Sequence, residues 1–240
     1  MAFKLIDLSQ EIYTGAPVWP GHPETRVDVV ATHEETVKSG RFTENYSYTA
    51  EKIAMSTHGT THTDSISHID PTPGAPSIDE LPLDWFYTDA ICLDLSHIPP
   101  RTEYTVEMIK EALDKHGLEI KKGDTVLLYS GHYVRTWGTP DWLTEYPGLG
   151  REAAEFIYGQ GVVNIGQDAP SHDRAGTTSY PAHQVCREMH GDAPEATRPG
   201  GVGEQLLVVR TADDHAGPQE VPRDAPVGRA EEVGAPGDER

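Results

Sequence analysis

The sequence predicts a single α/β domain, with a mixed β core flanked by helices. Short apolar runs typical of strands alternate along the chain with segments whose apolar residues recur at helical spacing. The chain has 240 residues and a hydrophobic content of 36%, which is enough for one sizeable core. We therefore expect one globular domain.

Five short runs are predicted to form strands, because their length and apolar content are typical of strands in compact domains. These runs are FKLIDL at 3–8, RVDVVAT at 26–32, AICLDL at 90–95, DTVLLYS at 124–130 and GVVNIG at 161–166.

Two segments between these runs are predicted to form helices. In TVEMIKEALDKHG, the apolar residues Val106, Ile109 and Leu113 recur at three and four residues. Thr105 is a candidate N-cap of this helix and Gly117 a candidate C-cap. The second segment, LGREAAEFIYGQG at 149–161, has similar character and also ends on glycine.

Two long connections, DPTPGAPSIDELPLDW at 70–85 and RTWGTPDWLTEYPG at 135–148, separate predicted elements. Connections of this length in a compact domain are usually functional or disordered, and their Trp and Tyr content favours ordered loops that shape a pocket. The sequence leaves open the alternative that they are surface loops anchored by aromatic residues.

The composition excludes several classes of partner. Lys+Arg number 19 against 39 Asp+Glu, a formal net charge of -20, and such a surface repels nucleic acid and anionic membranes. The only cysteines, Cys92 and Cys186, lie too far apart in sequence to suggest a disulfide framework or a thiolate zinc site. The N-terminal residues contain no long apolar run, so we expect a cytoplasmic protein.

The last fifty residues differ from the rest, and we divide the chain into a domain at 1–190 and a tail at 191–240. The tail contains no Phe, Tyr, Trp, Ile, Met, Lys, Ser, Asn or Cys, so most of it is expected to lack a packed core. Its composition is that of GC-rich codons. We hypothesise that it is read in a shifted frame, which translation of the other two frames of the gene would test.

The segment THGTTHTDSISHID at 57–70 brings His58, His62, Asp64 and His68 into eleven residues. Ligands of one metal ion lie about 2.0–2.2 Å from it, so their donor atoms must converge. A continuous strand would spread these residues over roughly 33 Å, and a helix would not gather all of them on one face. The chain must therefore curl at this point to form a metal site. The alternative is a group of hydrogen-bonded surface or core histidines.

This His-x-x-x-His-x-Asp-x-x-x-His pattern resembles the signature of the cyclase family, the metal-dependent group that includes bacterial kynurenine formamidase and isatin hydrolase. Further similarities follow in order along the chain: DLSQEI at 7–12, VWPGHP at 18–23, DTVLLYSG at 124–131, GQDAPSHD at 166–173 and SYPAH ending at 183. The resemblance covers roughly residues 5–190, and it implies a cyclase-like α/β fold.

The resemblance also implies roles for individual residues. His58, His62 and Asp64 would be metal ligands and His68 the acid/base catalyst. His183 and Glu195 would help to hold a second metal ion, although Glu195 lies within the anomalous tail. Trp19 would lie near the substrate ring, and the alternative for it is a packing aromatic beside a turn.

The function that follows is a metal-dependent amidohydrolase acting on a small N-formyl aromatic amide, an arylformamidase-like activity of tryptophan catabolism. One or two ions of zinc or manganese suit the mixed imidazole and carboxylate ligands. The family also suggests a homodimer or higher homo-oligomer. Three alternatives stay open: hydrolysis of a cyclic amide or lactone at the same site, a non-catalytic metal-binding protein, and a misfolded product of a frame-shifted gene.

Overall fold

The computed structural model describes residues 6–192 of the chain, and the side chains of residues 6–189. Along the sequence the elements are β1 (Arg26–Ala31), α1 (His33–Lys38), β2 (Ala50–Ala54), α2 (Ile66–Ile69), η1 (Ile78–Glu80), η2 (Leu83–Phe86), β3 (Ala90–Asp94), β4 (Glu103–Tyr104), α3 (Val106–His116), β5 (Thr125–Tyr129), α4 (His132–Thr136), η3 (Pro140–Leu143), β6 (Gly148–Leu149), α5 (Arg151–Tyr158), β7 (Asn164–Gln167) and α6 (Pro181–Asp192).

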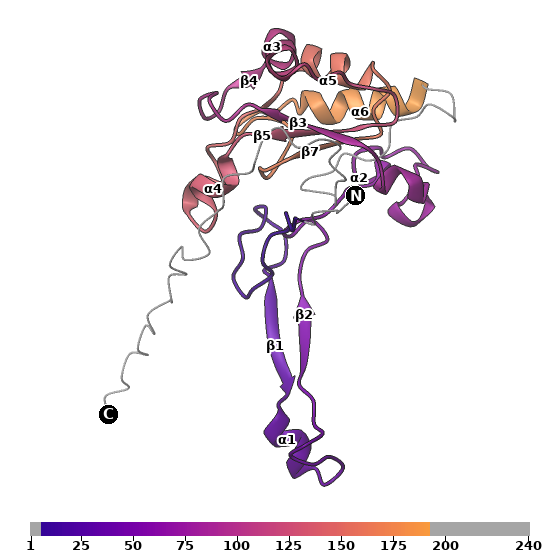
Figure 1. The fold of residues 1–240 in the computed structure, drawn as a ribbon. Coiled ribbons are helices and arrows are strands. Elements are labelled where there is room, and N and C mark those ends of the chain that lie inside the picture. The colour runs from indigo at the N-terminus through magenta and orange to yellow at the C-terminus, as the bar shows by residue number, and fades with distance from the viewer. Residues whose placement is uncertain (1–5, 193–240) are drawn as a thin grey trace, which may run out of the picture.

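The core of the body is a parallel sheet of three strands in the order β3-β5-β7. Strand β5 is central, and its residues Val126 and Leu128 are almost fully buried. Central strands of parallel sheets are covered on both faces and therefore carry continuous apolar runs, as TVLLY does here. In Figure 1, α3, α5 and α6 lie together on one side of this sheet.

The two predicted helices form where the sequence placed them. The side chain of Thr105 caps α3 by accepting a hydrogen bond from the backbone of Met108, and Gly117 ends the helix with a positive φ of 60°, which glycine adopts at low cost. Helix α5 buries Ala154 and Ile157 against the core. The α/β prediction is confirmed, with parallel and antiparallel strands in separate sheets.

Four of the five predicted strands are present: β1, β3 and β5 lie within their predicted runs, whereas β7 begins three residues later than predicted and extends one residue further. The prediction of a strand at 3–8 is wrong over its described part, since residues 6–8 are not in a strand. There the carboxylate of Asp7 accepts hydrogen bonds from the backbone and hydroxyl of Ser9. This local turn-like bonding competes with pairing to another strand. Strand β2 and helix α6 were not predicted.

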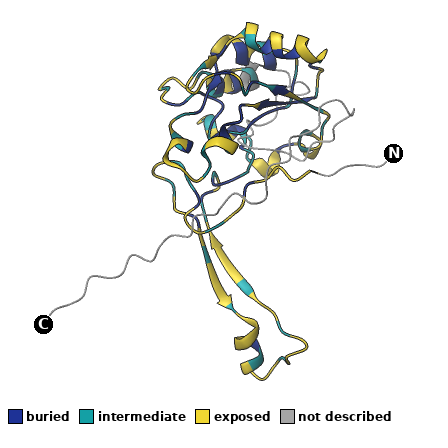
Figure 2. Cartoon of the chain, turned by 60° about the vertical axis from the view of Figure 1, so that its left-hand side comes forward, coloured by how far each residue is buried: buried dark blue, intermediate teal, exposed yellow. Residues whose placement is uncertain are grey.

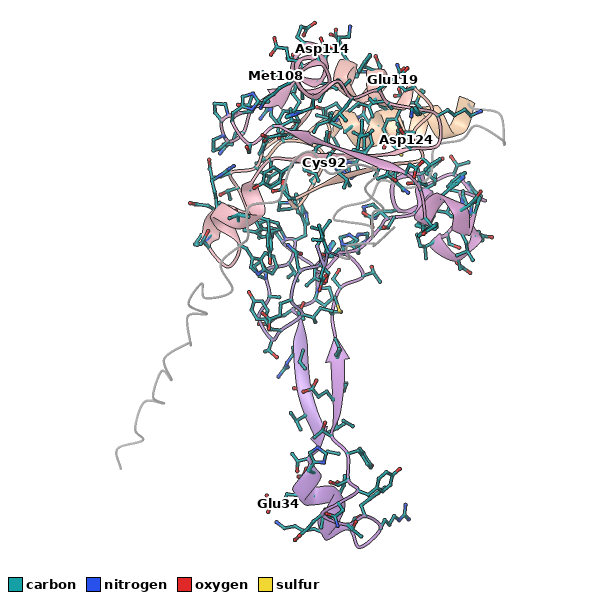
Figure 3. All side chains as sticks on the ribbon, in the orientation of Figure 1. Glu34, Cys92, Met108, Asp114, Glu119 and Asp124 are labelled. Carbon is teal, nitrogen blue, oxygen red and sulfur yellow. The ribbon has the colours of Figure 1, made fainter. Side chains whose placement is uncertain are left out.

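Strands β1 and β2 form an antiparallel ribbon that carries α1 at its end. We call residues 26–54 the arm. The arm projects from the body on the side away from α3, α5 and α6 (Figure 1), and it is exposed over nearly its whole length (Figure 2). Side chains crowd the body but are sparse along the arm, with Glu34 near its tip (Figure 3).

The long connection at 135–148 is ordered and contains η3. Its residues Trp137, Trp142 and Leu143 line a cavity, so the prediction that it shapes a pocket is confirmed. The connection at 70–85 contains η1 and η2. Within residues 6–192, no helix has the length and apolar character needed to cross a bilayer. The tail from 193 onward lies outside the described residues, so the boundary at 190 and the shifted frame stay predictions.

Candidate metal centre

The histidine-rich segment curls as the ligand geometry requires. Strand β2 ends at Ala54, and Ser56 then ties the turn together: its carbonyl accepts from the backbone of Gly59 and its hydroxyl from the backbone of His58. A Cβ atom on Gly59 would lie 3.2 Å from the carbonyl of Ser56, so a larger residue would crowd this turn. Thr60 follows with a positive φ of 62°, which turns the chain back toward the body.

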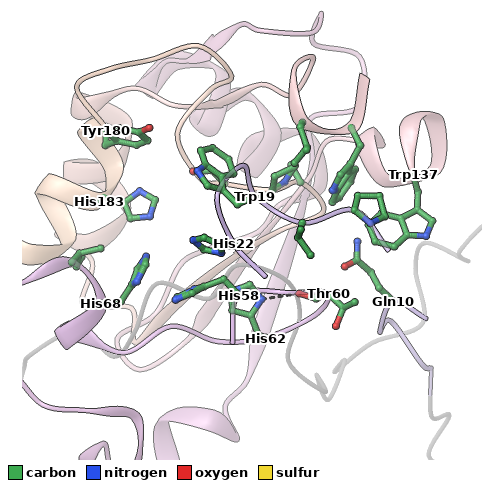
Figure 4. Close-up of a pocket in the computed structure, with 18 of the residues that line it drawn as sticks. Gln10, Trp19, His22, His58, Thr60, His62, His68, Trp137, Tyr180 and His183 are labelled. Carbon is green, nitrogen blue, oxygen red and sulfur yellow. Dashed lines mark hydrogen bonds between the residues drawn. The ribbon is translucent and has the colours of Figure 1, made fainter. Parts of the chain in front are cut away.

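This curl gathers the histidines around Asp64. Nδ1 of His58 lies 2.7 Å from Oδ1 of Asp64, and Nε2 of His62 lies 3.5 Å from the same oxygen. Nε2 of His68, on the single turn of α2, lies 3.8 Å from Oδ2. Donor atoms of His58, Asp64 and His68 lie within 4.8 Å of one another, so these three residues could hold a metal ion. Figure 4 shows the three histidines on the floor of the cavity.

The electrostatics of the cluster suit a divalent cation. Burial lowers the pKa of His58 and of His68, and it outweighs the carboxylate of Asp64, which raises both. Burial by itself raises the pKa of Asp64. The hydrogen bond from His62 and the charges of the histidines have the larger, opposite effect, so the pKa lies below its usual value. Neutral imidazoles beside an ionised carboxylate are the protonation states that bind metal.

The buried carboxylate provides a direct test of whether an ion fits. Asp64 is only 4% exposed, and within residues 6–192 its Oδ2 atom has no hydrogen-bond partner. Burying a charged oxygen without a hydrogen bond is costly, and a cation between Asp64 and the surrounding imidazoles would remove that cost. The residues present therefore fit a divalent metal ion.

His183, on α6, faces the same cavity. Its ring centroid lies 6.4 Å from that of His68, so it stands beside the cluster formed by the 57–70 segment. Nδ1 of His183 is hydrogen-bonded to Oδ2 of Asp173. The structure thus brings His58, His62, Asp64, His68 and His183 together. Glu195, the remaining predicted ligand, lies outside the described residues.

The cavity above the cluster has a volume of about 380 Å³. Trp19, Trp137 and Trp142 contribute to its walls, together with Ala169 and Pro170 from the loop after β7. That loop begins at the carboxyl end of the parallel sheet, the edge at which open α/β sheets usually bind ligands. The loop is fixed by Asp168, whose Oδ1 accepts from the backbone and hydroxyl of Ser130 at 2.7 and 2.6 Å.

Sequence reasoning missed two histidines near the cluster. His22 lines the cavity and bonds through Nδ1 to the hydroxyl of Ser56 at 3.0 Å. Its position within VWPGHP was the available signal. His172 is 1% exposed, and burial, followed by the charge of His183, lowers its pKa to about 4. No spacing in the sequence marks His172, because its surroundings come from segments distant in sequence.

Comparison with known proteins identifies relatives of this chain. The chain is 30% identical over 185 residues to a kynurenine formamidase from Geobacillus thermodenitrificans, covering 77% of this chain and 76% of that protein. It is 26% identical over 185 residues to the kynurenine formamidase of Salinibacter ruber, covering 75% and 76%.

Solved structures show the same fold. Isatin hydrolase A from Labrenzia aggregata aligns with a TM-score of 0.67 and 23% identity, covering 85% of this chain and 81% of that one. Isatin hydrolase A from Ralstonia solanacearum aligns with a TM-score of 0.67 and 20% identity, covering 83% and 78%. The family described as "Putative cyclase" matches residues 6–174. The chain therefore belongs to this cyclase family.

Proposed function

We propose that this protein is a metal-dependent hydrolase that cleaves a small N-formyl aromatic amide. The observation that carries the proposal is the gathering of His58, His62 and His68 around the carboxylate of Asp64, at 2.7, 3.5 and 3.8 Å from its oxygens, at the floor of a cavity with tryptophan in its walls. The kynurenine formamidases to which the chain is similar support the substrate class.

Zinc or manganese would be held by His58, His62 and Asp64, and a second ion would involve His183 and Glu195. Such an ion, when bound, lowers the pKa of a coordinated water toward about 7 and polarises a carbonyl oxygen. Asp64 supplies negative charge from a buried position. The lowered pKa of His58 keeps its imidazole neutral, so it can ligate at neutral pH.

His68 is the proposed acid/base catalyst. Its side chain is 35% exposed, the largest value among the histidines paired with Asp64, so substrate and solvent can reach it. Its pKa is lowered, first by burial, and it is therefore neutral at pH 7 and able to accept a proton from the attacking water. The resulting imidazolium, stabilised by Asp64, can pass that proton to the departing amine.

The walls of the cavity suit an aromatic substrate. Trp19 and Trp137 line the cavity and are half-buried, so they offer apolar ring surface, which packs favourably against another ring. Gln10 and Ser171 line the same cavity and offer hydrogen-bonding groups that could orient an amide. A volume of about 380 Å³ lies within the usual range for small-molecule sites, which is about 300–1,000 Å³.

A substrate panel on the metal-loaded full-length chain tests this proposal. The rate of hydrolysis would be measured for an N-formyl aryl amide, a cyclic amide and a lactone. Each compound would be tested with the unaltered chain, with His58→Ala and with His33→Ala. His33 lies on the exposed arm and is the matched control. We expect preferred hydrolysis of the formyl amide, abolished only by His58→Ala. Preference for the cyclic amide or lactone would contradict the proposed substrate class. Metal binding without turnover of any of the three compounds would contradict the proposal that the protein is a hydrolase.

We also propose that a second copy of the chain covers the arm. An isolated two-stranded ribbon is only marginally stable in water, yet Val29 and Ile53 on the arm are 61% and 53% exposed. Val27 pairs with Ile53, and Val29, two residues further along, shares their face. Residues 26–54 carry four basic and five acidic side chains, a net charge of -1, within a chain of net charge -20. Contact between two arms therefore avoids most of the repulsion between copies.

A further inference from the structure

The carboxylate of Asp173 joins two parts of the molecule. Asp173 lies in the loop after β7, and its side chain is 0% exposed. Its Oδ1 atom accepts a hydrogen bond from the backbone N–H of Ala182 at 2.7 Å, in the first turn of α6. Its Oδ2 atom is hydrogen-bonded to Nδ1 of His183. One buried carboxylate thus contacts both the start of the helix and the histidine that the helix presents to the cavity.

The contact with His183 fixes which nitrogen of that ring carries the proton. A carboxylate only accepts hydrogen bonds, so Nδ1 of a neutral His183 must be the donor toward Asp173. The other ring nitrogen, Nε2, then keeps its lone pair. A histidine that binds a metal ion through one nitrogen commonly donates the other N–H to a carboxylate.

We infer that Asp173 is a positioning residue that holds His183 in its Nδ1–H tautomer, so that Nε2 is the nitrogen presented to the cavity. This inference rests on the proposed function only for its consequence, which is that Nε2 is ready to bind a metal ion. Capping of α6 by Asp173 would by itself require only the contact with Ala182. The contact with His183 is the part that bears on the site.

The variant Asp173→Asn separates these two roles. The backbone N–H of Ala182 requires an acceptor, so the amide oxygen of the new side chain should take the place of Oδ1. The amide NH2 group then faces Nδ1 of His183 and donates to it. The helix keeps its cap, but His183 is driven into the Nε2–H tautomer, in which the nitrogen toward the cavity has no lone pair to offer.

The matched control is Asp168→Asn. Asp168 lies in the same loop and is half-buried, but the described hydrogen bonds of its side chain go to Ser130. The same chemical change there should lower stability and leave the tautomer of His183 as it was. A general loosening of the loop would affect both variants alike.

The primary measurement is long-range 1H–15N correlation NMR on the metal-free, full-length chain labelled with 15N-histidine, at a pH where the imidazoles are neutral. His183→Gln assigns the signal. We expect the Nδ1–H tautomer in the unaltered chain and in Asp168→Asn, and the Nε2–H tautomer in Asp173→Asn. An Nε2–H tautomer of His183 in the unaltered chain would by itself overturn the inference. A folded Asp173→Asn variant in which His183 keeps the Nδ1–H tautomer would also overturn it.

A second measurement is the dissociation constant for zinc or manganese, obtained by competition with a chelator. We expect Asp173→Asn to bind metal about 10–100-fold more weakly, as removal of such carboxylate partners usually does, and more weakly than Asp168→Asn. Equal affinities in the two variants would refute the consequence for metal binding. If the proposed hydrolase function is wrong but the inference about Asp173 is right, the tautomers and metal affinities will be as expected and no substrate will be turned over.

Discussion

The body and the arm of this protein are stabilised in different ways. Around the cavity, Asp64 and Asp173 are buried, and they contact His68 on α2 and His183 on α6, respectively. The arm instead holds β1 and β2 together by their own ladder and leaves Val29, Val30 and Ile53 exposed. The difference is that buried contacts between elements hold the cavity of the body in place, whereas the described arm leaves these apolar side chains exposed.

The largest expected effect is in the body, in the pair His62→Ala and His68→Ala. His68→Ala should keep metal and lose roughly 10²–10⁴-fold in turnover, the usual contribution of an acid/base group. His62→Ala should lose both metal and turnover. Metal content and kcat of the two purified variants decide this.

Equal loss of metal in both variants would contradict these roles. It would make His68 a ligand, which its 3.8 Å separation from Asp64 would allow. His33→Ala on the arm, far from the cluster in sequence, should change neither quantity and serves as the control.

Acid should destabilise the body through His172. The folded pKa of His172 is about 4, below the value of about 6.5 expected for the unfolded chain. Between these pH values the unfolded chain binds more protons, so stability is highest above pH ~6.5 and falls as the pH drops toward 4. The difference corresponds to on the order of 3 kcal/mol.

Urea unfolding of the metal-free chain between about pH 7 and pH 4.5 measures this slope. His172→Leu should flatten it, while the same change at the exposed His116 should not. A slope in His172→Leu as steep as in the unaltered chain would show that His172 does not carry the effect.

Charge placed on the arm should break the proposed association. Val29→Asp buries an unpaired carboxylate in any arm-to-arm contact, so the dimer dissociation constant should rise about 10–100-fold, equivalent to about 1.4–2.7 kcal/mol. Leu83→Asp is the control, because Leu83 is 85% exposed on η2 of the body. Analytical ultracentrifugation of the full-length chain gives the constants. A monomeric unaltered chain, or equal effects of both variants, would refute the arm as the interface.

The smallest effect compares the two regions through equivalent helix caps. Thr105 caps α3 in the body and Thr32 caps α1 in the arm, each through its hydroxyl. Thr105→Ala should lower the free energy of unfolding of the body by about 1 kcal/mol. At protein concentrations low enough to dissociate a dimer, Thr32→Ala should leave that free energy unchanged, because the arm then unfolds locally. A similar loss in both variants would mean that the arm and body unfold as one unit.

Much of the fold was predictable because local signals agree with the final structure. The buried strand TVLLY and the capped helix α3 each carry their own pattern. The strand predicted at 3–8 failed because an apolar run specifies no partner strand. Strand β2 was missed because AEKIA has one β-branched residue, Ile53, and no aromatic residue, and because its pairing with β1 spans α1 and the loop after it.

The candidate site was predictable where its residues are close in sequence. His58, His62, Asp64 and His68 lie in one segment, so their spacing carried the signal. His22 and His172 reach the site only through the fold, and the contact between Asp173 and His183 spans ten residues with no regular spacing. Metal ligation by these residues, and any part taken by Glu195, stay predictions.

Metal content of the purified chain tests the central claim most directly. It would be measured by elemental analysis before and after dialysis against a chelator, and again after zinc or manganese is added back, for the unaltered chain and for His58→Ala. We expect stoichiometric metal that is removed by the chelator and regained on addition, and a marked loss in His58→Ala. No bound metal in the folded, unaltered chain under either condition would contradict the assignment of this cluster as a metal centre.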